Sequence, residues 1–197
     1  MLLYKYRGLG NLRHALDIFV KSRMHAAVFT KLNDPMEGIY TYDPDQFNRQ
    51  DIESIWDSKN SYRILSLSET PNNMLMWSYY AAAHTGMVVG VIVNREAIVE
   101  PVQYVDHLAI DTQHQDVARG ILIKKLKLWK HEKEQRAFIR NENFIRVEVR
   151  ELIFGLNTNG ETKTLVTQVA EKFCPNIIVR TIERGEIDTG TRGGIDA

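Results

Sequence analysis

The chain has 197 residues, with 25 lysines and arginines against 25 aspartates and glutamates. Its net charge is therefore zero, which argues against general binding to nucleic acid or to an anionic membrane. A hydrophobic content of 44% and only five prolines are typical of a globular domain with a sizeable core rather than of a disordered chain. The single Cys174 excludes an internal disulfide, and without a long apolar run or a signal-peptide layout we expect a cytoplasmic protein.

The first half of the chain predicts short strands alternating with helices. Asn11 is expected to cap a helix whose apolar residues recur every three or four positions, and Asn33-Asp34-Pro35 has the chemistry of a turn. Residues 62–68 alternate as a strand does, and residues 86–93 form the apolar run typical of a strand buried on both faces. The expected strands are 2–6, 26–30, 62–68 and 86–93, and the expected helices are 12–20, 44–58 and 71–83.

The second half predicts one long helix and then a strand-rich stretch. The helix is expected from residue 116 to about 132, with Lys124, Lys125, Lys127 and Lys130 mostly on its outer side. Further strands are expected at 102–105, 136–139, 144–149, 152–156 and 177–182, and a further helix at 165–173. No internal repeat or linker interrupts the pattern. The sequence therefore predicts a single α+β domain over residues 1–184, with a central, mostly antiparallel sheet and flanking helices, followed by a flexible tail at 185–197.

Two glutamates near the end of the expected long helix are candidates for acid–base chemistry. Glu132 and Glu134 share one face if they lie on a strand, and they point about 200° apart on a helix. Because the segment lies where helix gives way to strand, we expect a shared face. Two neighbouring carboxylates repel, which raises the pKa of one of them and permits a division into acid and base. The alternative is a solvated charge run, since His131, Lys133 and Arg136 interleave.

Two serines and an arginine at the ends of expected strands are candidates for ligand binding. Ser66 and Ser68 lie two residues apart, so their hydroxyls share a face of a strand. Arg7 ends the first strand, where a guanidinium suits a bidentate grip on phosphate. A strand running into a turn, and an ordinary surface arginine, explain the same residues without a ligand. Neither serine lies in a Gly-x-Ser-x-Gly elbow, so the sequence does not support a hydrolase nucleophile.

Aromatic residues gather in the segment Met76-Trp77-Ser78-Tyr79-Tyr80-Ala81 and return at Trp129. Trp77 and Tyr80 can stack on a planar ring or bury a helix face, and His84 is the histidine best placed for a cleft, with capping of a helix end as its alternative. None of the six histidines has the spacing of a metal motif, so we expect no metal cofactor.

Seven segments together resemble the bacterial and phage domain-of-unknown-function 2971 family. They run from near the first residue to about residue 155, so the resemblance covers most of the chain, and no single segment carries it. The segments are Leu3-Tyr4-Lys5-Tyr6-Arg7, Leu32-Asn33-Asp34-Pro35-Met36-Glu37, Leu65-Ser66-Leu67-Ser68-Glu69, Met76-Trp77-Ser78-Tyr79-Tyr80-Ala81, His84-Thr85-Gly86, Trp129-Lys130-His131-Glu132-Lys133-Glu134-Gln135-Arg136 and Val149-Arg150-Glu151-Leu152-Ile153-Phe154-Gly155. The family name implies no activity.

A second resemblance implies a mechanism. An arginine on the first strand, then Ser-x-Ser, then Glu-x-Glu is similar to the Arg-Ser-Glu class of ADP-ribosyltransferases, which implies NAD as a substrate. The resemblance implies that Arg7 and Ser68 help to bind NAD and that Ser66 holds Glu134. It further implies that Glu134 stabilises the cationic transition state as nicotinamide leaves, while Glu132 orients or deprotonates the acceptor. Trp77, Tyr80 and His84 are the expected neighbours of the cofactor. The aromatic helix after the serines departs from the signature of that class.

Three functional hypotheses therefore stand. The first is an ADP-ribosyltransferase or NAD glycohydrolase that serves as a toxin or phage-defence effector, with an acceptor that the sequence does not identify. The second is a non-catalytic nucleotide- or peptide-binding module, which predicts a site rich in Trp77, Tyr80 and Trp129 with the two glutamates solvated or salt-bridged. The third is a nuclease, which needs metal ligands such as Asp111 or Asp116 with Glu132 and Lys133. The neutral net charge weighs against the nuclease.

Overall fold

A computed structural model describes residues 1–188 and divides them into two compact units, whose segments alternate along the chain. Unit 1 contains residues 1–22, 69–92 and 149–188, and unit 2 contains residues 23–68 and 93–148. Because the segments alternate, no single cut in the sequence separates the two units. Both units combine helices with mainly antiparallel strands, so the prediction of a mostly antiparallel α+β fold is confirmed.

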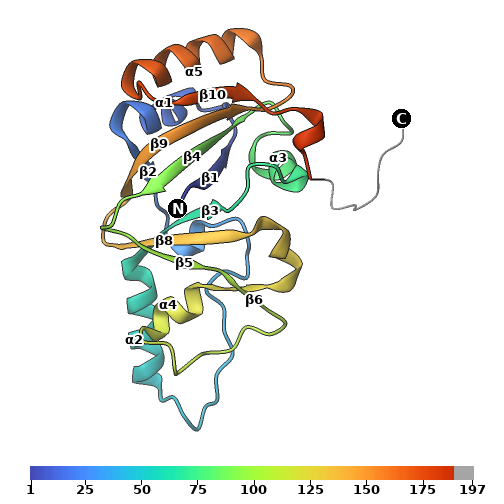
Figure 1. Cartoon of the computed structure of the whole chain (residues 1–197). Coiled ribbons are helices and arrows are strands. Elements are labelled where there is room, and N and C mark those ends of the chain that lie inside the picture. Colours follow the sequence, from blue (N-terminus) through green and yellow to red (C-terminus); the bar gives the residue numbers. More distant parts are fainter. Residues whose placement is uncertain (189–197) are drawn as a thin grey trace, which may run out of the picture. The chain divides into compact units, whose positions relative to one another are not determined.

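Unit 1 has four neighbouring strands in the order β10-β9-β4-β1 (Figure 1). Strand β1 is antiparallel to β4, and β10 is parallel to β9. Helices α1 and α5 pack against each other. The elements are β1 (Leu3–Arg7), α1 (Leu12–Lys21), α3 (Met74–Tyr80), β4 (Met87–Val93) except its last residue, the second half of β9 (Phe144–Phe154), α5 (Gly160–Phe173), β10 (Ile178–Thr181) and the 3-10 turn η3 (Arg184–Glu186).

The core of unit 1 forms around Trp77, which is fully buried. Its indole N–H donates to the carbonyl of Pro71 at 2.7 Å, so burial leaves this polar group satisfied. Tyr6 meets the indole edge-on at 5.5 Å and anchors the start of α3, because its hydroxyl accepts a hydrogen bond from the N–H of Asn73 at 3.2 Å. A few residues after β1, the expected cap of α1 is confirmed, since the side chain of Asn11 accepts from the N–H of His14.

The turn between α3 and β4 is backbone-strained. Ala82, Ala83 and His84 all have positive φ values, of 49°, 52° and 65°, a conformation that costs a side-chain-bearing residue about 1 kcal/mol or more. Gly86 follows, and a Cβ atom there would lie 2.3 Å from the carbonyl oxygen of Arg7 and 2.7 Å from that of Ala81. The turn is therefore possible only because residue 86 has no side chain.

Replacing Gly86 by Ala is expected to lower the free energy of unfolding by about 3 kcal/mol, because both clashing atoms belong to the backbone and cannot rotate away. The matched control is Gly10→Ala, where a Cβ meets no atom within 4 Å, and we expect a change within about 0.5 kcal/mol. Urea denaturation of the two variants measures the difference. Equal stabilities would contradict the close approach at Gly86.

Unit 2 has three antiparallel strands in the order β3-β8-β5, together with two smaller pairings (Figure 1). Strand β2 pairs with the first half of β9, and β6 pairs in parallel with β7. The elements are β2 (Arg23–His25), the 3-10 turn η1 (Phe29–Lys31), α2 (Arg49–Ser61), β3 (Tyr62–Ser68), β5 (Ile98–Pro101), β6 (Gln103–Val105), α4 (Val117–Leu122), β7 (Lys124–Leu126), the 3-10 turn η2 (Lys127–Glu132), β8 (Glu134–Arg140) and the first half of β9.

Helices α2 and α4 pack together, and residues from α4, β3 and β8 share the core of unit 2. Ile64, Leu122 and Phe138 are almost fully buried there. The expected continuous helix over residues 116–132 is wrong: α4 ends at Leu122, residues 124–126 pair with β6 as a strand, and residues 127–132 form a 3-10 turn. The expected strand over 26–30 is also wrong: the strand lies at residues 23–25, and a 3-10 turn follows.

Residues 185–188, the described part of the predicted tail, contact the rest of unit 1. Asp188 forms an isolated bridge with Asn73, and its N–H donates to the carbonyl of Asn72 at 2.8 Å. The remainder of the predicted tail, 189–197, lies outside the described residues. Among the helices of residues 1–188, none is long and apolar enough to cross a membrane.

Candidate functional site

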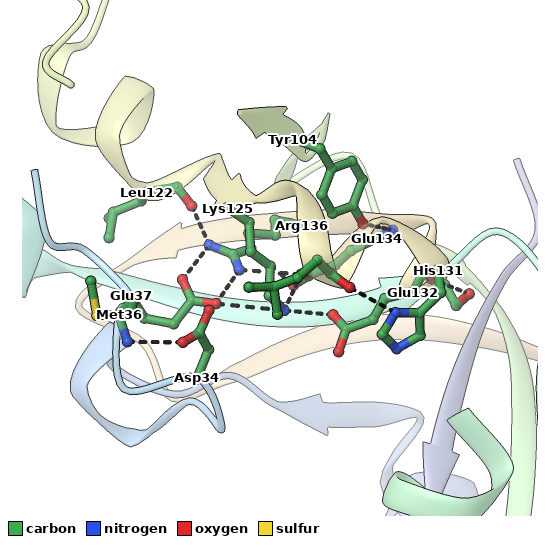
Figure 2. A network of polar contacts seen from close by, with 12 residues as sticks. Asp34, Met36, Glu37, Tyr104, Leu122, Lys125, His131, Glu132, Glu134 and Arg136 are labelled. Carbon is green, nitrogen blue, oxygen red and sulfur yellow. Dashed lines mark hydrogen bonds and ion pairs between the residues drawn. The ribbon is translucent and has the colours of Figure 1, made fainter. Parts of the chain in front are cut away.

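Unit 2 contains five charged side chains that are buried together, and we call them the charge network (Figure 2). Each of the five residues is between 0 and 7% exposed. Side chains of this kind are almost never buried unless they are paired, so each must find partners inside the protein. The members are Glu37, Lys125, Glu132, Glu134 and Arg136.

Arg136 lies at the centre of the network and uses all five of its N–H donors. Its two terminal nitrogens hold the Glu37 carboxylate at 2.8 and 2.5 Å. Its Nε and Nη2 hold the Glu134 carboxylate at 2.8 and 3.2 Å. The last donor reaches the carbonyl of Leu122 at 2.5 Å, at the end of α4. Arg136 therefore binds two carboxylates with its planar fork, an arrangement that lysine cannot provide.

Lys125 is the second cation of the network. Its Nζ lies 2.5 Å from Glu132, 3.1 Å from Glu134 and 3.8 Å from Glu37, so it contacts all three carboxylates. The ring of Trp129 lies 4.9 Å from the same ammonium. The expectation that the lysines of this segment lie mostly outside is wrong for Lys125, because residues 124–126 form a strand, in which alternate side chains face opposite ways.

A left-handed residue brings Glu132 and Glu134 to the same side. Turn η2 ends at Glu132, Lys133 has φ 46°, and β8 begins at Glu134. Two further hydrogen bonds fix this corner: Ser68 donates to the carbonyl of Glu132 at 2.7 Å, and the hydroxyl of Tyr104 accepts from the N–H of Glu134 at 2.8 Å. The expected shared face is confirmed, since both carboxylates reach the ammonium of Lys125.

Replacing Lys133 by Gly is expected to raise the free energy of unfolding by about 0.5–1 kcal/mol. The side chain is exposed, and glycine adopts the left-handed conformation without the steric cost that lysine bears there. Lys130→Gly is the control: Lys130 lies inside η2, so glycine there is expected to destabilise the protein. Thermal unfolding of both variants gives the sign, and a loss of stability in Lys133→Gly would contradict the strained corner.

The two candidate serines both contact this corner. In the register of β3 and β8, Ser68 lies opposite Glu134 and Ser66 lies opposite Arg136. Ser66 also hydrogen-bonds the carboxylate of Glu134, and this bond helps to lower the pKa of that group. The geometry thus brings together the serines and the two glutamates that the sequence singled out.

Charge counting shows that the network is not neutral. Three carboxylates face two cations, which leaves one negative charge in excess when all five groups are ionised. Burial alone would raise the pKa of Glu134, but Arg136 and Lys125 hold that pKa at about 2. For Glu37 burial dominates, and its pKa is raised although Arg136 opposes the shift. Burial would lower the pKa of Lys125, but Glu134 and Glu132 together raise it.

Sequence reasoning missed three members of the network: Glu37, Lys125 and Arg136. The sequence places Arg136 in a run of charged residues and Glu37 beside the Asn33-Asp34-Pro35 turn, and neither position predicts a buried ion pair. A usable signal existed for Arg136, because an arginine two residues after Glu134 on a strand shares its face. No local signal could have found Glu37, which lies 99 residues before its partner.

The other candidates lie in unit 1. Trp77 is fully buried and stacks on the ring of His84, while Tyr80 is partly buried against the same core. Burial lowers the pKa of His84, which favours the neutral ring. Burial also lowers the pKa of Arg7, whose Nε makes no hydrogen bond within the described part of the chain. All four residues belong to unit 1.

The acidic residues of the nuclease hypothesis do not form a metal site in the described chain. Asp116 caps α4, and its carboxylate also binds Tyr62 at 2.5 Å and Arg140 at 2.9 Å. Throughout residues 1–188, no group of three or more histidine, cysteine, aspartate or glutamate side chains is arranged to hold a metal ion.

No family model, curated protein or solved structure matches the chain.

Proposed function

We propose that the protein cleaves the bond between nicotinamide and ribose in NAD, as an ADP-ribosyltransferase or an NAD glycohydrolase. The observation that supports this proposal is the excess negative charge of the charge network, in which Glu134 stays ionised. A fixed buried anion is suited to a reaction in which positive charge develops on the substrate. Glu134 is the proposed stabiliser of that charge.

In the proposed reaction, positive charge moves from the nicotinamide ring to the ribose. The bond between ribose C1′ and the nicotinamide nitrogen breaks, its electron pair leaves with nicotinamide, and the ribose becomes an oxocarbenium-like cation. A nucleophile, which is water in a glycohydrolase and a macromolecular group in a transferase, then attacks C1′ and gives up its proton. Glu132 is the proposed acceptor of this proton, because it lies beside Glu134 and shares Lys125 with it.

Two further residues support the proposal, each within its own unit. The hydrogen bond from Ser66 orients the Glu134 carboxylate, which is the role that the resemblance to ADP-ribosyltransferases implies. Within unit 1, the buried Nε of Arg7 makes no hydrogen bond to residues 1–188, and a phosphate group is the ligand that we propose for this guanidinium. Ser68, by contrast, donates its hydroxyl to the carbonyl of Glu132, which gives it a supporting role.

A second candidate function is a non-catalytic binding module. That hypothesis predicts salt-bridged glutamates, and both Glu132 and Glu134 pair with Lys125. Such a network can also serve only to fix the conformation of unit 2. The two candidates differ in turnover: the module binds a nucleotide or peptide without consuming it.

The deciding experiment incubates the protein with NAD labelled in its adenine ring and measures free nicotinamide and label transferred to protein, RNA, DNA and small molecules. Glu134→Gln keeps the size of the side chain and removes its charge. Glu142→Gln, in the exposed turn after β8, is the matched control.

We expect nicotinamide release by the native protein and by Glu142→Gln, and a loss of at least about 100-fold in Glu134→Gln, in the range that one electrostatic group contributes to catalysis. The fraction that holds the label identifies the acceptor. Absence of turnover from the folded native protein, or equal rates in the two variants, would overturn the proposal and favour the binding module.

A further inference from the structure

Lys59 in α2 is a buried cation outside the charge network. Its side chain is almost fully buried, with 1% of the residue exposed. The Nζ donates one hydrogen bond, to the carbonyl of Gly38 at 2.7 Å. Across residues 1–188 it pairs with no carboxylate, so no opposite charge compensates its burial. A buried ammonium of this kind is costly, and its presence calls for a role.

Three aromatic rings surround the ammonium. The Nζ lies 4.8 Å from the ring centre of Phe29, 4.6 Å from that of Tyr40 and 5.2 Å from that of Trp56. All three distances are within the range at which the negative face of a ring attracts a cation. The aromatic cage and the Gly38 carbonyl therefore hold the charged form of Lys59 at a fixed position.

The carbonyl that Lys59 binds belongs to the turn that carries Glu37. Asp34 starts this turn by accepting a hydrogen bond from the N–H of Met36 at 2.9 Å, and the N–H of Glu37 donates to the Asp34 carbonyl at 3.1 Å. Gly38 ends it with φ 70°, and a Cβ there would lie 2.5 Å from the ring of Phe29. Phe29 therefore contacts both Lys59 and the turn.

We propose that Lys59 is a positioning residue, which holds the Glu37 carboxylate against Arg136 by binding the carbonyl of Gly38. Glu37 occupies one side of the Arg136 guanidinium, and Glu134 occupies the other. A shift of Glu37 therefore reorients the guanidinium that holds Glu134. As a statement about catalysis this inference rests on the proposed function, but the contact itself is testable without NAD.

The charge on Lys59 is accessible to a pH titration, because burial lowers its pKa to about 8. Tyr40 is the titratable ring of the cage, and burial raises its pKa, so it stays neutral while Lys59 titrates. The neutral amine loses its attraction to the rings and donates a weaker hydrogen bond. Above pH 8 we therefore expect the Glu37 turn to loosen.

The test follows the Nε–H signal of Arg136 by nitrogen-15 NMR between pH 7 and pH 9.5. In the native protein we expect the signal to shift with a midpoint near pH 8, while that of Arg140, on the exposed end of the same strand, shows no such midpoint. Lys59→Met should place the Arg136 signal near its high-pH position throughout. Lys59→Arg, which stays charged, should keep it near the native pH 7 position throughout.

Lys124→Met is the matched control, because Lys124 also donates to a backbone carbonyl, that of Ala109 at 2.8 Å, in another part of unit 2. We expect it to preserve the native titration. An Arg136 signal that does not titrate in the native protein would overturn the proposal, even if Lys59→Met does not fold. An unchanged midpoint in Lys59→Met would overturn it as well. Both outcomes are independent of whether the protein turns over NAD.

Discussion

Replacing Arg136 by Met is expected to lower the free energy of unfolding by about 3–5 kcal/mol, the cost of removing one partner from a buried ion pair. The guanidinium is fully buried and is the shared partner of Glu37 and Glu134. Without it, three buried carboxylates face Lys125 alone. Arg136→Lys keeps the charge but loses the bidentate fork, so we expect an intermediate loss of about 2 kcal/mol.

Arg140→Met is the matched control on the same strand. Arg140 also pairs with a carboxylate, that of Asp116, but its side chain is 48% exposed, and we expect a cost of about 1 kcal/mol or less. Urea denaturation measures all three variants. In a double-mutant cycle, Glu37→Gln with Arg136→Met should cost on the order of 1–3 kcal/mol less than the sum of the single changes. Additive costs would mean that the two residues act independently.

The sequence predicted those parts of the fold that local chemistry decides. Residues 62–68 form strand β3 with the expected bounds, because apolar and polar residue types alternate over most of this segment. Asn11 caps α1, and Asp34 begins a turn, since both side chains bond to backbone groups two or three residues away. Glu132 and Glu134 were expected on one face for a related reason, because their separation is short.

The rest depended on partners distant in sequence. Residues 117–132 contain apolar side chains spaced for a helix, yet the pattern does not show that Gln103–Val105 is available as a parallel partner for Lys124–Leu126. Once that pairing turns Lys125 inward, its role in the network follows. The sequence does not predict the roles of Glu37 and Lys59 for the same reason. The role of Glu37 depends on its contact with Arg136, and that of Lys59 on its contact with the Gly38 carbonyl, and both contacts form only on folding.

Acid is expected to destabilise the protein through Glu134. Its pKa is about 2 in the folded chain against an ordinary value of 4.5, so the stabilisation that this carboxylate provides is complete above pH 5 and is lost as the pH falls from about 5 to 2. The difference corresponds to about 3 kcal/mol. Glu134→Gln should lose that amount at pH 7 and should show a correspondingly smaller loss in acid, measured by urea denaturation at pH 7, 5, 4 and 3.

Glu37, in the same network, is expected to change the stability with pH in the opposite direction to Glu134. Because burial raises its pKa above 4.5, the stabilisation that its proton provides is present below that pH and is lost as the pH rises through the folded value. Both Glu37→Gln and Glu134→Gln leave two carboxylates against two cations, but only Glu37→Gln removes a carboxylate whose ionisation burial penalises, so it should cost less at pH 7 than Glu134→Gln. If Glu37→Gln instead cost more stability than Glu134→Gln, the carboxylate whose ionisation is penalised would be Glu134. Glu134 would then be the group that takes up a proton, and it could not be the permanent anion that the proposed reaction requires.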